Sequence, residues 1–274
     1  MAFNDPFGQQ NPYGQQQNQF GQQPPYGQQN QFGQQPRELF PSLWGSQEDL
    51  DKATTSCLAR VFLRMFIALL VTAAVSFTIY RTPGAMEYLI SNPFLTLGMI
   101  VVQFIVVMIL SFRVMKMSPA VSNVMFFAYA ILTGVTLSFI FISYELGTIF
   151  QAFAIAALMF GAMAIFGTVT HRDLTKLGSL CLMGLIGIII ASIISIFTGG
   201  FSDTITLIIN YIAVLIFVGL TAYHTQRIKN MLRQANETNQ DEAIKKISVM
   251  GALSLYLSFI NLFLRILAIM GRKR

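Results

Sequence analysis

"SLYLSFINLFLR" occupies residues 254–265, within an apolar stretch that is long enough to cross a membrane. Four polar side chains recur along it at i, i+4, i+7 and i+11: Ser254, Ser258, Asn261 and Arg265. This spacing places all four on one stripe of a helix. Because an amide or guanidinium group that faces lipid has no hydrogen-bond partner, the stripe is expected to face protein or water. The sequence therefore predicts a helix packed inside a larger membrane bundle.

The whole chain has the composition of a membrane protein. Of its 274 residues, 54% are hydrophobic and 11% are charged, whereas about 25% are charged in soluble domains. Seven apolar segments can span a hydrocarbon core of about 30 Å at 1.5 Å per residue. We expect an all-α integral membrane bundle of seven transmembrane helices, at 61–80, 94–112, 120–142, 149–169, 177–197, 205–223 and 247–270, separated by Pro83, Pro93, Pro119 and the pair Gly199 and Gly200.

The positions of lysine and arginine predict the orientation of this bundle, because positively charged loops stay in the cytoplasm. Twelve of these residues fall on the N-terminal side of the predicted membrane and four on the other side, which predicts a cytoplasmic N-terminus. An odd number of helices then places the basic tripeptide 272–274 outside, so either it is tolerated there or the last helix does not fully cross. The net charge of +6 is explained by these cations, so it does not predict a nucleic-acid partner.

The N-terminal region differs from the rest of the chain. An aromatic residue followed by Gly-Gln-Gln recurs five times within residues 1–36. Such a segment has too few clustered apolar side chains to offset the entropy of ordering, so residues 1–50 are predicted to be a disordered tail and 51–274 the membrane domain. The tail is either an inert solvated segment or a source of weak multivalent contacts. Residues 39–52 are expected to lead into the first helix as a short amphipathic segment.

The polar residues within the membrane allow more than one interpretation. Serines at helix contacts commonly serve close packing, so Ser254 and Ser258 alone do not require a function. Arg265 is expected near the outer face, where it either anchors the helix by reaching water or lines a pathway. Other candidates for interior polar positions are Gln103, Asn123, Thr133, Thr136, Ser138, Gln151 and Asn210.

Three segments resemble the Bax inhibitor-1 family, the transmembrane Bax inhibitor motif proteins. They are GALSLYLSFINLFLRILAIMG at 251–271, LTAYHTQRIKNM at 220–231 and LSFRVMKMSPAVSNVMFFAYAILTGVTL at 110–137. The likeness covers about residues 55–271 and leaves the Gln-rich tail outside. It implies a compact bundle with the seventh helix in the centre. It also implies a pH-sensitive calcium leak gated by one aspartate on each of helices 6 and 7, with a basic residue at the end of helix 2, or binding to a membrane-bound ATP-dependent protease. The bacterial likeness implies an inner-membrane location.

Both of the family's acidic positions differ in this sequence. His224 stands where the helix 6 aspartate is expected, and Ser258 stands at the helix 7 position. The basic residue of helix 2 falls at Lys116, with Arg113 as the alternative. Because calcium prefers carboxylate and carbonyl oxygens, the aspartate switch is not expected in its usual form. An imidazole titrates near pH about 6.5, so a pH response of reversed sign is predicted through His224.

The position of His224 leaves an alternative open. A sixth helix that ends at 223 puts this residue at the inner interface, where it would donate to water or to a loop carbonyl. For His224 to approach Ser258, the helix must extend or shift inward. The sequence thus predicts either a pH-linked membrane position or an interfacial histidine.

Three functions follow from these features. The first is an ion pathway for calcium or protons, lined by the polar stripe and His224. The second is a non-conducting regulator that binds a membrane-bound protease or another membrane protein. The third is a hydrolase with Ser258 as nucleophile and His224 as base. No Gly-x-Ser-Gly loop or oxyanion donor accompanies Ser258, so the sequence predicts no enzymatic activity, no cofactor and no metal site.

Overall fold

The computed structural model describes residues 47–271. The predicted disordered tail up to residue 46 and the basic tripeptide 272–274 lie outside the described residues, so the predictions about them stay predictions. Residues 47–50, which were expected to belong to the tail, already form the first turn of a helix.

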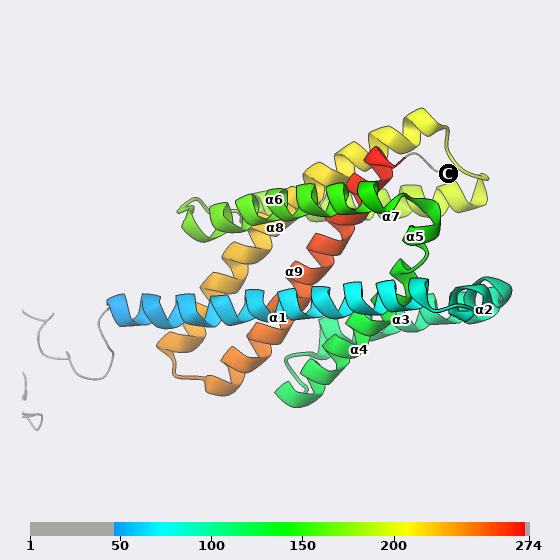
Figure 1. Ribbon diagram of the computed structural model, residues 1–274. Helices are drawn as coiled ribbons and strands as arrows, with labels where there is room; N and C mark the ends of the chain where they lie inside the picture. The colour runs from blue at the N-terminus through cyan, green and yellow to red at the C-terminus, as the bar shows by residue number, and fades with distance from the viewer. Residues whose placement is uncertain (1–46, 272–274) are drawn as a thin grey trace, which may run out of the picture. The chain divides into compact units, whose positions relative to one another are not determined.

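The described chain is entirely α-helical, apart from short connections (Figure 1). Its helices are α1 (Gln47–Arg81), α2 (Ala85–Ser91), α3 (Pro93–Arg113), α4 (Pro119–Leu137), α5 (Ile140–Ser143), α6 (Leu146–Val169), α7 (Thr175–Phe197), α8 (Asp203–Glu237) and α9 (Asp241–Met270). Seven segments of the described chain are long and apolar enough to cross a membrane: α1, α3, α4 together with α5, α6, α7, α8 and α9. The predicted all-α membrane bundle with seven spanning helices is confirmed.

The breaks between helices fall at the predicted residues. Pro93 and Pro119 begin α3 and α4, where the missing amide hydrogen of proline has no intrahelical partner to lose. The Ser118 hydroxyl caps α4 by accepting from the backbone N–H of Val121. Gly199 and Gly200 have φ of 77° and 104°, left-handed values that let the chain turn sharply between α7 and α8.

Several helices differ in extent from the sequence prediction. The first begins at Gln47 instead of residue 61, and α8 continues to Glu237 instead of ending at 223. The expected boundaries followed apolarity, but Arg, Lys and Gln are good helix formers and extend a helix beyond the membrane. The predicted segment 120–142 is interrupted after Leu137, and its last residues form the separate turn α5.

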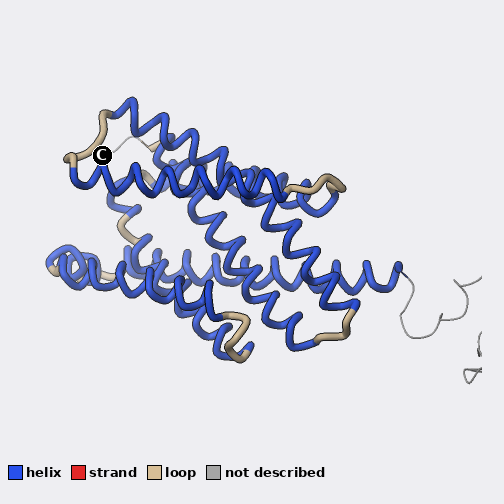
Figure 2. The backbone as a smooth tube through the Cα atoms, turned by 180° about the vertical axis from the view of Figure 1, so that it is seen from behind, coloured by secondary structure: helices blue, strands red, loops and turns tan. Residues whose placement is uncertain are grey.

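The last helix, α9, lies in the centre of the bundle, as predicted. It runs obliquely through the bundle, past α1 and toward α6, and packs against α1, α4, α6 and α8 (Figures 1 and 2). In its most apolar window 56% of the residues are buried, compared with 6% for α3. A helix surrounded by protein can carry polar groups that lipid would not satisfy, so α9 is where the polar stripe belongs.

The two ends of the bundle differ in charge. The connections 114–118, 170–174 and 238–240 lie at the same end as the start of α1, and the described Lys and Arg outside the membrane are concentrated there. We call this the basic end, and the end that carries α2 and α5 the opposite end. The predicted cytoplasmic side corresponds to the basic end.

Candidate functional site

The polar stripe of α9 is satisfied mainly by its own helix. The Ser254 hydroxyl donates to the carbonyl of Met250 (3.0 Å), and the Ser258 hydroxyl donates to that of Ser254 (3.0 Å). Asn261 Nδ2 donates to the carbonyl of Leu257 (2.8 Å). Ser258 is buried, whereas Ser254 and Asn261 are half-buried. These bonds to the preceding turn let hydroxyl and amide groups sit in a helix contact without a partner on another helix.

Arg265 makes the one bond of the stripe that joins two helices. Its Nη1 donates to Oδ1 of the buried Asn210 on α8 at 3.1 Å. The sequence predicted a side chain that reaches water or lines a pathway. The structure shows a half-buried guanidinium that bonds to an amide oxygen, and both predicted roles stay predictions. Since a bond to a charged group is stronger than a neutral one, this contact fixes α8 against α9 near the opposite end.

His224 lies inside a continuous helix, because α8 extends well beyond it. Two contacts set the register of the antiparallel helices α8 and α9. Arg265 meets Asn210, and a Cβ at Gly251 would lie 3.1 Å from the side chain of Ile228. This register puts His224 level with residues 251–255, about one to two turns from Ser258 on the side of the basic end.

The neighbours of His224 are an aromatic ring and a cation. Its imidazole lies 5.4 Å from the ring centroid of Tyr223, and Arg227 is the charged group that acts on it. Ser258 donates to a backbone carbonyl instead of to the imidazole. The structure therefore brings His224 to the α8–α9 contact without pairing it with Ser258.

The structure does not bring Lys116 and Arg113 to this contact. Arg113 ends α3 and Lys116 lies in the following turn, where both side chains are exposed. Neither forms an ion pair or a side-chain hydrogen bond with any described residue. Because α3 packs mainly against α4, these cations lie at the edge of the basic end.

Tyr256, the largest fully buried side chain among the described residues, was not predicted from the sequence. Its side chain has 0% exposure, and its hydroxyl lies 2.7 Å from Thr72 Oγ1. Thr72 Oγ1 is also within 2.9 Å of the carbonyl of Ala130 on α4. The Tyr256 ring packs edge-on against Phe126 and Tyr129, at centroid distances of 5.7 and 6.0 Å. Tyr256 thus joins α1, α4 and α9, and its position between two serines of the stripe was the available signal.

The other predicted interior positions have mixed outcomes. Gln103 joins α3 to α4 through two hydrogen bonds. It donates to Thr133 Oγ1 at 3.0 Å and accepts from Thr136 Oγ1 at 3.2 Å. Asn123 Oδ1 is buried and has no hydrogen-bond partner among the described residues. Gln151 is exposed near the start of α6, so its interior assignment was wrong. An amide so close to a helix end can reach the interface, which removes the need for burial.

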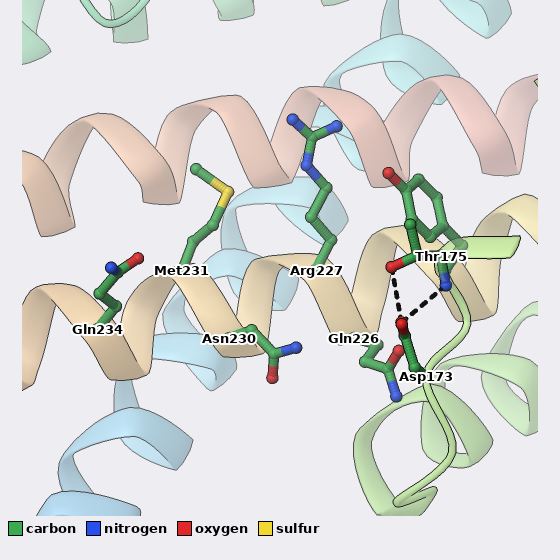
Figure 3. Close-up of a pocket in the computed structure, with 8 residues that line it drawn as sticks. Asp173, Thr175, Gln226, Arg227, Asn230, Met231 and Gln234 are labelled. Carbon is green, nitrogen blue, oxygen red and sulfur yellow. Dashed lines mark hydrogen bonds between the residues drawn. The ribbon is translucent and has the colours of Figure 1, made fainter. Parts of the chain in front are cut away.

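Two adjoining polar cavities open at the basic end. One, of about 490 Å³, lies between α1, α6, the α6–α7 connection and α8, and includes His171, Lys229 and Arg233 in its lining. The other, of about 270 Å³, is shown in Figure 3. Both are lined by Asp173 and Gln226. In the sequence, Lys229 and Arg233 indicated only the orientation of the chain, and no local pattern placed them beside His171.

Gln226 holds the α6–α7 connection against α8. Its Oε1 accepts from the backbone N–H of Leu174 (2.9 Å), and its Nε2 donates to the carbonyl of Arg172 (2.8 Å). Lys229 Nζ donates to the carbonyl of Thr168 at 2.8 Å. The bond from Lys229 satisfies a carbonyl that the end of α6 leaves unpaired, and the two bonds of Gln226 satisfy backbone groups of the connection.

Asp173 lies in the connection before α7 and bonds to Thr175, the first residue of that helix (Figure 3). Its Oδ1 accepts from the Thr175 hydroxyl (2.6 Å) and from the Thr175 backbone N–H (2.9 Å), and these bonds hold the pKa of Asp173 below its ordinary value. A carboxylate whose pKa is lowered by folding stabilises the fold above its unfolded pKa, and this contribution is lost as the pH falls through the lowered value.

We expect Asp173→Ala to lower thermal stability at neutral pH and to have little effect in strong acid. Equal losses at both pH values, in thermal unfolding, would contradict this assignment.

Comparison with known proteins places the chain in a family. The family model described as "Inhibitor of apoptosis-promoting Bax1" matches residues 54–274. The inner membrane protein YbhL of Escherichia coli (strain K12) is 42% identical over 217 residues, which cover 79% of this chain and 92% of that protein. A protein of Borreliella burgdorferi is 39% identical over 79% of this chain and 92% of its own length, and one of Deinococcus radiodurans is 35% identical over 81% and 93%. The chain therefore belongs to the Bax inhibitor-1 family of integral membrane proteins.

Proposed function

We propose that this multi-pass membrane protein carries an ion pathway along the α8–α9 contact, closed in the present conformation and modulated by pH through His224. The observation that supports it is the succession of polar groups along this contact. From the cavities at the basic end it runs through His224 and Thr225 to the stripe of α9, and it ends at the pair of Arg265 and Asn210. Polar groups at membrane depth are costly and commonly mark ion or proton paths.

The pathway is closed because the centre of the bundle is filled. At the α8–α9 contact, the side chain of Ile228 is 3% exposed and lies against Gly251, and Leu220 is 2% exposed. The hydroxyls of the stripe bond to their own helix and would become available to an ion only if α8 and α9 moved apart. Opening therefore requires a change in helix packing, which is how a two-state gate operates.

The charges along the contact favour a selectivity other than for calcium. Calcium requires several oxygen ligands, mostly carboxylates and carbonyls. The described residues contain no group of three or more His, Cys, Asp or Glu that could hold a metal ion. Arg265 places a positive charge near the opposite end of the path. We therefore propose protons or monovalent ions, in place of calcium, as the permeating species, because His224 and Ser258 carry no carboxylate.

A flux assay in liposomes tests the pathway. Protonation of His224 adds positive charge, so cation flux should fall as the pH is lowered from about 8 to about 3.5; the range extends into acid because burial and the neighbouring Arg227 both disfavour the charged imidazole. We expect His224→Gln to remove this pH dependence and His171→Gln, which alters the only other histidine of the chain, to keep it. Flux that is unchanged by both His224→Gln and Asn261→Ala would contradict the pathway.

The second candidate is a non-conducting regulator that binds a membrane-bound protease or another membrane protein. The self-satisfied bonds of the stripe favour it, because a stripe that serves packing needs no ion. In the same assay, a silent wild type together with a leak in the His224→Asp, Ser258→Asp double variant would support the regulator. We further propose that the protein has no catalytic activity and lies in a bacterial inner membrane with a cytoplasmic N-terminus, as the inner-membrane location of YbhL suggests.

A further inference from the structure

A cavity of about 530 Å³ lies in the half of the bundle toward the opposite end, away from the α8–α9 contact. Its walls come from α1, α4, α5, α6 and α9. Thr72, Ser76, Phe259 and Phe263 line it and are at most 5% exposed, so they form its floor. Leu146 and Phe150, which also line it, are 53% and 73% exposed. The cavity therefore opens sideways between α1 and α6, toward the lipid.

Ser76 is an unusual residue in this lining. The hydroxyls of Thr72, Ser254 and Ser258 each bond to the carbonyl four residues earlier. The Ser76 side chain is 3% exposed, and its Oγ has no hydrogen-bond partner among the described residues. A buried hydroxyl without a partner costs free energy that a bonded occupant would recover. The unpaired Ser76 hydroxyl therefore indicates that a molecule bound in the cavity carries a hydrogen-bond acceptor.

The rim above Ser76 combines aromatic rings with a cation. Phe141 lines the cavity, stacks on Tyr80 at a centroid distance of 5.0 Å and meets Phe77 edge-on at 6.2 Å. The Arg81 guanidinium lies 5.4 Å from the centroid of the Phe77 ring. Aromatic rings and arginine at the end of a spanning helix are typical of the level of lipid headgroups.

The depth of Ser76 fits this level. It lies five residues before Arg81, which corresponds to about 7.5 Å along the helix axis. The headgroup region on each side of the hydrocarbon core is about 5–8 Å thick. Ser76 is thus placed where the ester carbonyls of a phospholipid lie when its phosphate is level with Arg81.

We propose that this cavity binds one phospholipid of the surrounding bilayer. An acyl chain fills the apolar floor, and the phosphate lies beside Arg81. Protein atoms cover Ser76 Oγ in the present conformation, so a rotation about χ1 turns the hydroxyl toward the cavity, where it donates to an ester carbonyl oxygen. The volume is within the range of about 300–1,000 Å³ that is typical of small-molecule sites. Water is a poor occupant because the lining is almost entirely aliphatic and aromatic, and an empty space would forfeit the dispersion contacts of its walls.

Native mass spectrometry of the protein released from nanodiscs of phosphatidylglycerol and phosphatidylethanolamine tests the site. We expect the wild type to retain one phospholipid. Ala73→Trp places a large ring in the cavity and should abolish retention, because Ala73 is part of the lining. Ala74→Trp is the matched control, since Ala74 is the next residue of α1, is also exposed and does not line the cavity. Equal retention by these two variants would overturn the proposal.

Two further comparisons keep the test informative if Ala73→Trp does not fold. Ser76→Ala removes one hydrogen bond and should weaken retention by about 2- to 10-fold, the equivalent of a neutral hydrogen bond. Retention equal to that of the wild type would refute the contact with the ester carbonyl. Oleic acid added in excess should fail to displace the phospholipid, because it lacks the phosphate that Arg81 holds. Displacement by oleic acid would overturn the assignment to a phospholipid.

Discussion

Gly167→Ala is expected to lower the melting temperature of the detergent-solubilised protein markedly, whereas Gly161→Ala should leave it equal or raise it. Both glycines lie in α6. A Cβ at Gly167 would overlap the carbonyl oxygen of Ala222 in α8, a backbone atom that cannot turn aside. A Cβ at Gly161 would meet nothing within 4 Å. The two helices must therefore separate in the first variant and not in the second.

The two variants are expected to change the free energy of unfolding in opposite directions. Overpacking a tight contact costs about 1–3 kcal/mol or more, and here the contact is between backbones, so we expect a loss of about 3 kcal/mol for Gly167→Ala. Alanine is favoured over glycine inside a helix by about 1 kcal/mol. In Gly161→Ala no overlap opposes this preference, so we expect this variant to gain up to that amount. Thermal unfolding followed by circular dichroism measures both. Similar shifts for the two variants would show that α6 and α8 are not in backbone contact at Gly167.

Tyr256→Ala is expected to be the most destabilising truncation in the bundle. Removing a large buried aromatic side chain costs about 3–5 kcal/mol, because the surrounding side chains collapse only partly into the space. The loss would release α9 from both α1 and α4, which meet at this residue. Tyr211→Ala on α8 is the control, since Tyr211 is 53% exposed and should change stability by less than about 0.5 kcal/mol in detergent.

Tyr256→Phe distinguishes the contribution of the hydroxyl to stability from that of the ring. It keeps the packing with Phe126 and removes only the bond with Thr72, so we expect a loss of about 1 kcal/mol. Combining it with Thr72→Val should cost less than the sum of the single losses, because both remove the same bond. Additive losses in thermal unfolding would indicate that the two hydroxyls do not interact.

Hydrophobic length was sufficient to predict the number of spanning helices. Each of the seven predicted segments corresponds to a spanning helix, because lipid requires every backbone group to be paired within its own helix. The positions of Pro93 and Pro119 also gave the starts of two helices correctly. Helix length could not be predicted from apolarity, since α8 continues past residue 223 through polar residues that favour a helix.

The amino-acid sequence was thus sufficient to predict the all-α membrane class, the central last helix and the polar stripe along it. The hydrogen-bond partners of that stripe were decided only by the tertiary structure. Ser258 bonds to its own helix, Arg265 bonds to Asn210, and Tyr256 takes the centre. A helical period states which residues share a face. Which neighbour that face meets, and at what height, depends on the register between helices, and no local pattern encodes it.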